Sequence, residues 1–253
     1  MARRRRNKRY RRGRLTVLLR FFSFVLICAA IVTALILFFR VETVEITGNQ
    51  RYTTEEVVEV TGIQEGDNLF LLNKYAIADQ ITGQLPYVQS VRFWRELPDT
   101  IVIEITECQA VAAVVQSEEA WLVSQGGKLL ERVPAEQASG YLQITGVTLL
   151  LPTEGSTMEL PEDGNISEEQ LLSLLTVLSE RNMLAEASQI DCSDEEALVM
   201  RYAGRFDVQI PYDADFNKKL YALQQIIDTL QDNETGTVIL TLPDRSFFKP
   251  DSN

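Results

Sequence analysis

The feature that most constrains this chain is an apolar stretch near its start. The nineteen residues Phe21–Phe39 contain no charged side chain, and Arg20 and Arg40 lie at its two ends. A helix rises roughly 1.5 Å per residue, so this stretch matches the hydrocarbon thickness of a bilayer. We therefore predict one transmembrane helix over residues 15–39, preceded by a basic tail over residues 1–14.

The charges on the two sides of this stretch predict its orientation. Residues 1–40 contain eleven Lys or Arg and no acidic residue, whereas residues 41–253 contain 13 basic and 36 acidic residues. Positive residues are retained in the cytoplasm, so the N-terminus is expected there and residues 41–253 outside. The basic residues that set this orientation and contact lipid headgroups are Arg3, Arg4, Arg5, Arg6, Lys8, Arg9, Arg11, Arg12 and Arg14.

The N-terminal region has two other interpretations, a cleaved secretory signal and a nucleic-acid-binding tail. A cleaved secretory signal would need a cleavage site of small residues, and Cys28-Ala29-Ala30 resembles one. The apolar run continues for nine residues beyond Ala30, which favours an anchor. A basic tail could also bind nucleic acid. Topology and anionic lipid explain these residues without a nucleic-acid partner, which we do not expect.

The composition of residues 41–253 limits the chemistry that they can perform. Their net charge of −23 argues against DNA or an anionic membrane as the partner of this part. The whole chain lacks histidine, which excludes Ser-His-Asp and Cys-His catalysis and zinc sites with histidine ligands. Cys108 and Cys192 are too few for a disulfide framework, and their redox state stays open.

The pattern over residues 40–108 predicts a small α+β domain. An alternating strand over 41–47 is followed by a helix capped by Thr53-Thr-Glu-Glu56 and a longer helix capped by Asn73. Two strands, Val88–Trp94 and Thr100–Glu107, follow across a turn. The order is β-α-α-β-β, with two helices on one face of a three-stranded sheet.

Several short motifs in this region resemble a known family. They are Val44-x-Ile46-x-Gly48-Asn49, Tyr52-Thr53, Gly62-Ile63, Gly66-x-Asn68-Leu69-Phe70, Pro86-Tyr87-Val88, Arg95-x-x-Pro98-x-Thr100 and Glu107. Their order and their place after the apolar stretch resemble the POTRA domain of the FtsQ/DivIB family of bacterial cell-division proteins. The resemblance implies a non-enzymatic divisome scaffold at the septum of the plasma membrane. Its implied partners are FtsB/DivIC-like and FtsL-like single-span division proteins.

The remaining residues, 109–253, predict a mostly antiparallel sheet with two helices. Strands are expected over 110–115, 120–124, 129–133, 141–147, 188–192, 197–202, 205–210 and 237–242. Helices are expected after the capping box Ser167-x-x-Gln170 and from Phe216 onward. Gln125-Gly-Gly-Lys128 lies between two strands and lacks the spacing of a phosphate loop, so it is predicted to be a hairpin turn. The position of residues 109–253 in the chain resembles that of the family's membrane-distal domain.

No residue pattern in the chain indicates catalysis. The acidic segment Asp191–Glu196 does not have the spacing of a calcium loop and is expected to be a solvated turn. We therefore predict no catalytic residue, metal ligand, cofactor or small-molecule substrate. The alternatives to a scaffold are a membrane-anchored extracytoplasmic cell-wall enzyme, which needs a nucleophile and base, and a sensor, which needs a cytoplasmic output domain.

The C-terminal segment is the predicted docking site. It alternates, with Val238, Leu240 and Leu242 expected toward the core and Thr237, Ile239 and Thr241 on the other face. No later segment is expected to cover it, so it is predicted to be an edge strand. The family resemblance implies that a strand of the FtsB/DivIC-like partner adds here, with Phe247 and Phe248 closing over it as aromatic anchors. The alternative is an internal or charge-protected strand, with both phenylalanines packed on their own domain.

Overall fold

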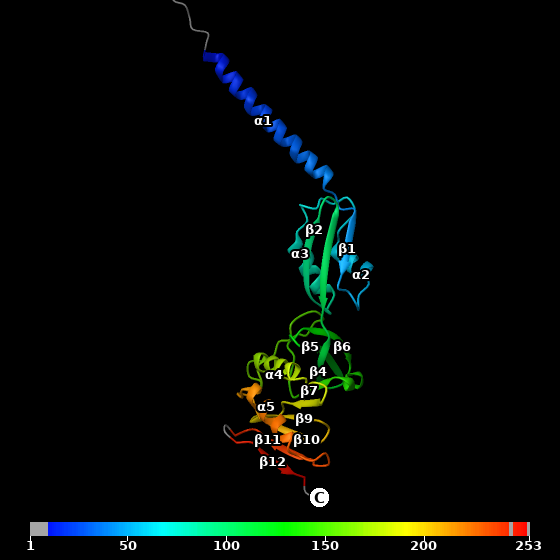
Figure 1. Cartoon of the computed structure of the whole chain (residues 1–253), viewed down its shortest axis with the longest axis vertical. Coiled ribbons are helices and arrows are strands. Elements are labelled where there is room, and N and C mark those ends of the chain that lie inside the picture. Colours follow the sequence, from blue (N-terminus) through cyan, green and yellow to red (C-terminus); the bar gives the residue numbers. More distant parts are fainter. Residues whose placement is uncertain (1–9, 243–244, 252–253) are drawn as a thin grey trace, which may run out of the picture.

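A computed structural model describes residues 10–242 and 245–251, with side chains from residue 17 onward. The chain forms one long helix, then a three-stranded sheet with two helices, then a nine-stranded sheet with two helices and a short 3-10 helix. These three parts follow one another along the long axis of the molecule (Figure 1). The predicted α+β fold class is confirmed.

The first helix, α1 (Tyr10–Phe38), contains the predicted apolar stretch. Its segment Val17–Phe38 has a mean hydropathy of 2.8 and is long and apolar enough to cross a membrane. The helix begins before the predicted residue 15, because the basic residues Arg11, Arg12 and Arg14 are favourable helix formers. The rest of the predicted basic tail, Arg3 to Arg9, lies outside the described residues.

The first domain consists of β1 (Thr43–Thr47), α2 (Thr54–Thr61), α3 (Lys74–Gln84), β2 (Val88–Glu96) and β3 (Thr100–Glu107). Its sheet has the order β1-β3-β2, with β1 parallel and β2 antiparallel to the central β3. The capping box forms as predicted, since Thr53 Oγ1 accepts a hydrogen bond from Glu56 N–H and Glu56 accepts one from Thr53 N–H.

The core of this domain lies between the sheet and the two helices. Ile101, Ile103 and Ile105 of β3 are buried as predicted and pack with Val57 of α2 and Ile81 of α3. Gly48 ends β1 with a positive φ, and a Cβ there would collide with the carbonyl oxygen of Ile105. The predicted turn at Gly48-Asn49 therefore has a steric cause.

The second domain has nine strands in one sheet. They are β4 (Ala110–Gln116), β5 (Glu119–Ser124), β6 (Leu129–Pro134), β7 (Leu142–Thr145), β8 (Ala187–Asp191), β9 (Ala197–Tyr202), β10 (Phe206–Pro211), β11 (Gly236–Ile239) and β12 (Phe247–Pro250). The sheet order is β12-β11-β10-β9-β8-β7-β4-β5-β6. Five of the eight pairings are antiparallel, as the sequence indicates.

Two helices, α4 (Glu168–Glu180) and α5 (Phe216–Ile227), pack against this sheet. The predicted leucine face of α4 is fully buried, as are Leu220 and Leu223 of α5. A short 3-10 helix, η1 (Ala135–Gly140), connects β6 and β7 and was not predicted. Lys128 follows the β5–β6 turn, which is a hairpin as predicted.

Candidate partner-docking site

The predicted docking strand occupies a different place in the sheet from the one expected. The strand β11 ends at Ile239 rather than Leu242 and lies between β10 and β12. The predicted position at the edge of the sheet is therefore wrong. The strand β12 pairs antiparallel with β11, so that Phe248 lies opposite Val238. Among the described residues, β12 is the edge strand at this end of the sheet.

The predicted face assignment is correct from Thr237 to Thr241 and wrong at Leu242. Val238 and Leu240 are fully buried, whereas Thr237, Ile239 and Thr241 are partly exposed. Leu242 was predicted in the core but is 45% exposed, because the regular strand ends three residues earlier and the alternation no longer holds.

The two phenylalanines belong to the edge strand itself and point in different directions. Phe248 packs against the core, with its ring 6.0 Å from that of Phe206 in an edge-to-face arrangement. Phe247 is 46% exposed. Of the two predicted anchors over an added strand, Phe247 remains a candidate. Phe248 does not, because its ring already packs on Phe206 in its own domain.

The pairing of β12 determines which of its backbone groups are free. Asp251 N–H donates to the carbonyl of Thr235 at 3.0 Å, and hydrogen-bonded pairs recur every second residue in an antiparallel ladder. Lys249 and Phe247 therefore direct their backbone groups toward β11. The N–H and C=O of Phe248 point away from the sheet, as does the C=O of Pro250, which has no N–H. This outer edge can pair with an incoming strand.

A groove lies between the start of α5 and the segment that connects β11 to β12. It has a volume of about 530 Å³, and its lining includes Asp215, Lys218, Lys219, Thr241 and Arg245. Asp215 caps α5 and accepts a hydrogen bond from Lys218 N–H, which lowers the pKa of its carboxyl group. The groove can therefore contact polar side chains of either charge.

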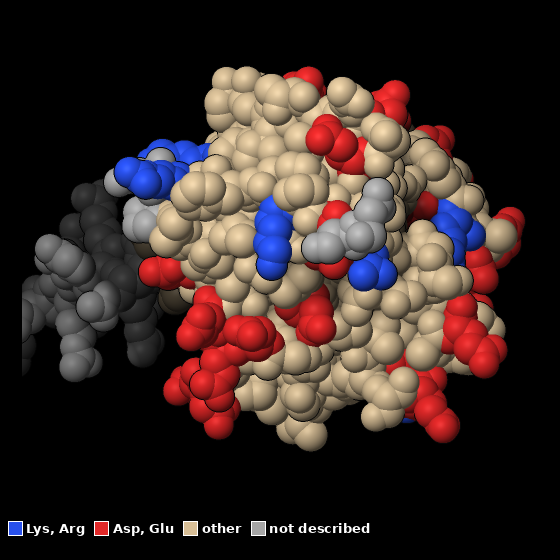
Figure 2. All heavy atoms as spheres, turned by 90° about the horizontal axis from the view of Figure 1, so that it is seen from below, with Lys and Arg blue, Asp and Glu red and all other residues tan. Residues whose placement is uncertain are grey.

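The surface around this end of the molecule is largely uncharged or acidic. Figure 2 shows acidic side chains in groups near the rim, with fewer basic side chains standing apart from one another. A peptide strand that carries basic residues at its ends would complement this surface.

The acidic segment Asp191–Glu196 connects β8 to β9, and the carboxylates of its two aspartates accept hydrogen bonds from neighbouring residues. Asp191 accepts hydrogen bonds from Ser193 N–H and Oγ, at 2.9 and 2.6 Å, which lower the pKa of its carboxyl group. Cys192 is buried, and this desolvation raises the pKa of its thiol to about 12. Cys108 and Cys192 are both free. Among the described residues, no three His, Cys, Asp or Glu side chains could hold a metal ion.

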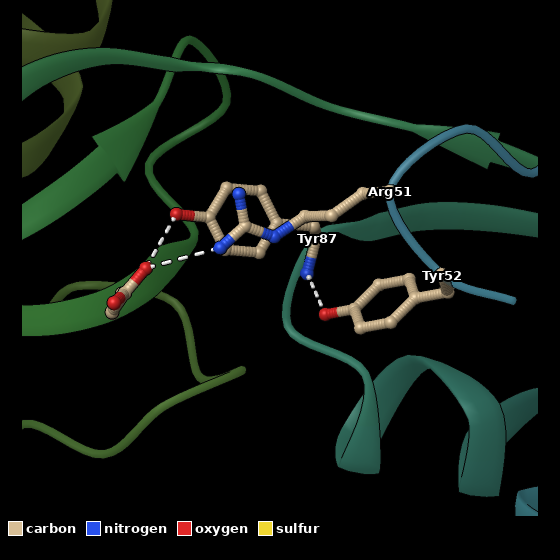
Figure 3. A network of polar contacts seen from close by, with 4 residues as sticks. Arg51, Tyr52 and Tyr87 are labelled. Atoms are coloured by element: carbon tan, nitrogen blue, oxygen red, sulfur yellow. Dashed lines mark hydrogen bonds and ion pairs between the residues drawn. The ribbon is translucent and has the colours of Figure 1, made fainter. Parts of the chain in front are cut away.

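A second polar cluster, at the junction of the two domains, was not predicted. Glu131 of β6 accepts hydrogen bonds from the Tyr87 hydroxyl at 3.0 Å and from the Arg51 guanidinium at 3.3 Å. The Arg51 guanidinium lies 3.7 Å above the Tyr87 ring, and Tyr52 Oη accepts a hydrogen bond from Tyr87 N–H (Figure 3). Burial and the hydrogen bond to Glu131 raise the pKa of Tyr87. We call Arg51, Tyr87 and Glu131 the junction cluster.

Two further contacts connect the domains on the other side of the junction. Lys128 Nζ donates to the carbonyl oxygens of Thr82 at 2.8 Å and Val88 at 2.7 Å. Burial lowers the pKa of Lys128. Gly155 approaches the end of α3 so closely that a Cβ there would lie 2.9 Å from the carbonyl oxygen of Gly83. Of the residues at this junction, Tyr52, Tyr87 and Val88 carried a sequence signal, as members of the family motifs.

The fold and the site define a protein with one membrane-length helix, two linked α+β domains and a free sheet edge. Residues 39–107 match the POTRA domain of FtsQ type. The cell division protein DivIB of Clostridium acetobutylicum is 28% identical over 201 residues, which cover 79% of this chain and 79% of that protein. The cell division protein FtsQ of Syntrophotalea carbinolica is 25% identical over 218 residues, covering 81% and 74%.

A solved structure of the major extracytoplasmic domain of DivIB from Geobacillus stearothermophilus aligns with 51% of this chain and 98% of that chain. The sequence identity is 15% and the TM-score is 0.30, which is too low to compare the two folds in detail. Residues 39–107 are therefore similar to POTRA domains of FtsQ type, and most of the chain is similar to the cell division proteins DivIB and FtsQ.

Proposed function

We propose that this protein is a non-enzymatic scaffold of the divisome that docks other membrane-anchored division proteins during septum formation. Its FtsQ-type POTRA domain and its similarity to the cell division proteins DivIB and FtsQ support this role. The absence of histidine from the sequence removes Ser-His-Asp and Cys-His catalysis and zinc sites with histidine ligands. A scaffold needs an anchor and accessible surfaces, and the chain offers one membrane-length helix and a free sheet edge.

The proposed arrangement places α1 across the plasma membrane, with the N-terminus in the cytoplasm and both domains outside. The eleven basic residues in residues 1–40 and the acidic composition of residues 41–253 support this orientation. A protein in this orientation can reach other single-span division proteins through its two outer domains.

The observation that carries the docking proposal is the unpaired outer edge of β12. An FtsB/DivIC-like partner adds a strand there by β-augmentation, and an FtsL-like protein joins through that partner. Backbone hydrogen bonds to Phe248 and Pro250 supply affinity, while side chains beside Phe247 and the groove at α5 supply selection. The missing N–H of Pro250 limits how far the added strand extends along the edge.

A pair of variants separates the backbone of the edge from its side chain. Phe248→Ala and Phe248→Pro both lose the ring contact with Phe206, but only the proline variant loses the outward N–H. Proline is tolerated on edge strands where the N–H faces solvent, so the pairing of β12 with β11 is retained. The loss of one interface hydrogen bond, about 1 kcal/mol, lowers affinity about fivefold before steric effects are added.

The measurement is the amount of FtsB/DivIC-like partner that co-purifies with each variant of the full chain from crosslinked membranes. We expect Phe248→Ala to retain most of the partner and Phe248→Pro to lose it. Equal recovery with both variants and the parent would show that the edge of β12 is not the docking site. Equal loss with both variants would assign binding to the ring instead of the backbone.

A further inference from the structure

The end of the first domain that adjoins α1 exposes four large apolar side chains. Phe70 is 54% exposed, Leu71 76%, Tyr75 71% and Leu97 59%. We call these four residues the apolar tip. They come from the segment between α2 and α3, from the first turn of α3 and from the β2–β3 turn. Clustered apolar side chains on a small soluble domain indicate an interaction surface.

Hydrogen bonds connect the two residues that precede Phe70 to the end of α1. Asn68 Nδ2 donates to the carbonyl of Ile36 at 3.2 Å, and Leu69 N–H donates to the carbonyl of Phe39 at 3.1 Å. The rings of Phe39 and Phe70 meet edge to face, with their centroids 5.2 Å apart. The turn after β2 is connected to the same region, because Glu42 N–H donates to the carbonyl of Asp99.

These contacts set the height of the apolar tip relative to a membrane. Ile36 lies inside the segment Val17–Phe38, and a helix of that length rises roughly 33 Å, about the thickness of the hydrocarbon layer. When α1 crosses a bilayer, the carbonyl of Ile36 lies near the hydrocarbon boundary. Asn68, which binds it, then lies there too, and Phe70 and Leu71 follow within two or three residues. Figure 1 shows the first domain directly below the end of α1.

The side chains around the apolar tip suit the headgroup layer. Aromatic rings concentrate at this depth, and long basic side chains extend from it toward water. Lys74 Nζ lies 5.0 Å from the Tyr75 ring centroid, and the Arg95 guanidinium lies 5.9 Å from that of Phe70. Exposed Glu42, Glu65 and Glu96 lie in neighbouring segments. Insertion of apolar side chains, rather than attraction to anionic lipid, is therefore expected to supply the free energy of binding to the membrane.

We propose that the apolar tip inserts into the lipid leaflet from which α1 emerges. This rests on the proposed crossing of the membrane by α1. Insertion holds the first domain in one orientation on the membrane. Because the junction cluster and Lys128 join the two domains, the edge of β12 is then presented at a defined height above the bilayer.

The test places a tryptophan at three sites of the full chain in phosphatidylcholine nanodiscs. Leu71→Trp reports on the apolar tip, and Leu151→Trp is the matched control, because Leu151 is 93% exposed in the second domain. Phe24→Trp reports on the crossing helix independently. Each emission spectrum, corrected for Trp94 and Trp121 of the parent, is compared between ordinary lipid and lipid brominated near the headgroup end of its acyl chains.

We expect bromine to quench most of the added emission of Leu71→Trp and Phe24→Trp and to leave that of Leu151→Trp unchanged. Quenching at residue 24 without quenching at residue 71 overturns the insertion and leaves the crossing of α1 intact. A blue-shifted but unquenched signal at residue 71 would show a protein occupant, such as a second copy of this chain, and also overturns it. No quenching at residue 24 overturns the crossing itself. Quenching at all three sites overturns the proposed orientation.

Discussion

Removal of the Glu131 carboxylate is expected to loosen the connection between the two domains. Glu131 lies in β6 of the second domain, and both of its partners, Arg51 and Tyr87, belong to the first domain. The substitutions Glu131→Ala and Tyr87→Phe remove the two ends of the same hydrogen bond. A double-mutant cycle over these two substitutions therefore measures a contact that exists only when the domains are joined.

The size of the expected coupling energy follows from the solvent exposure of the Tyr87, Glu131 and Arg51 side chains. Tyr87 is only 8% exposed, and a hydrogen bond from a buried hydroxyl to a carboxylate contributes about 1.5–3 kcal/mol. The side chain of Glu131 is 42% exposed, so solvent screening reduces this to about 1–1.5 kcal/mol. The ion pair with Arg51, whose side chain is 53% exposed, adds about 0.5 kcal/mol and is lost only in Glu131→Ala.

The assay is unfolding of the full chain in detergent micelles by urea, followed by circular dichroism. We expect a coupling energy of about 1 kcal/mol between residues 87 and 131. Glu119→Ala is the control, because its ion pair with Arg132 is similarly exposed but lies within the second domain. That variant is expected to change the free energy of unfolding by less than about 0.5 kcal/mol.

Additive effects of Glu131→Ala and Tyr87→Phe, within about 0.5 kcal/mol, would refute this reasoning. Such a result would mean that Glu131 and Tyr87 do not interact in the folded protein. Lys128, the packing of Gly155 on α3 and the apolar contacts of Tyr87 with the second domain would then connect the two domains.

Two further predictions concern the core of the first domain and the topology of the chain. Ile103→Asp places a carboxylate at a fully buried position of the central strand and is expected to lower the free energy of unfolding by several kcal/mol. Val44→Asp, at a half-buried position, is expected to lower it less. Thermal melting of both variants checks this order. A reporter enzyme that is active only outside the cytoplasm, fused after Asn253, is expected to be active, and replacing the nine leading Lys and Arg with Gln is expected to reduce that activity.

The first domain could be predicted well because its signals are local. The capping box at Thr53, the cap at Asn73 and the isoleucine alternation in β3 each act within a few residues. The α4 helix was predictable for the same reason, since Ser167 caps it and its leucines recur at the helical period. In each case the local preference and the tertiary packing favour the same structure.

The junction cluster could not be predicted because its signal is not local. Glu131 and Lys128 are ordinary polar residues near a hairpin turn, and each is separated by at least forty residues from its partners in the first domain. Their role depends on how one domain is placed on the other, which no periodicity encodes. Tyr87 and Tyr52 appeared in family motifs, but a motif does not say which surface a side chain contacts.

The misplaced edge strand has the same physical origin, and it changes how the docking site is understood. A four-residue strand such as Phe247–Pro250 has too few positions for alternation to be recognised, and Pro250 argues against an interior strand. At an edge, however, proline needs no partner for its missing N–H, and one inward phenylalanine, Phe248, is enough to attach the strand to the core through Phe206. Such a strand adds little stability to its own sheet but leaves a free backbone edge. Pro250 limits pairing at one end of this edge, which also disfavours unselective association with other strands. The same short sequence that conceals β12 from pattern analysis therefore leaves outward-facing backbone groups on this strand, as the proposed docking of a partner strand requires.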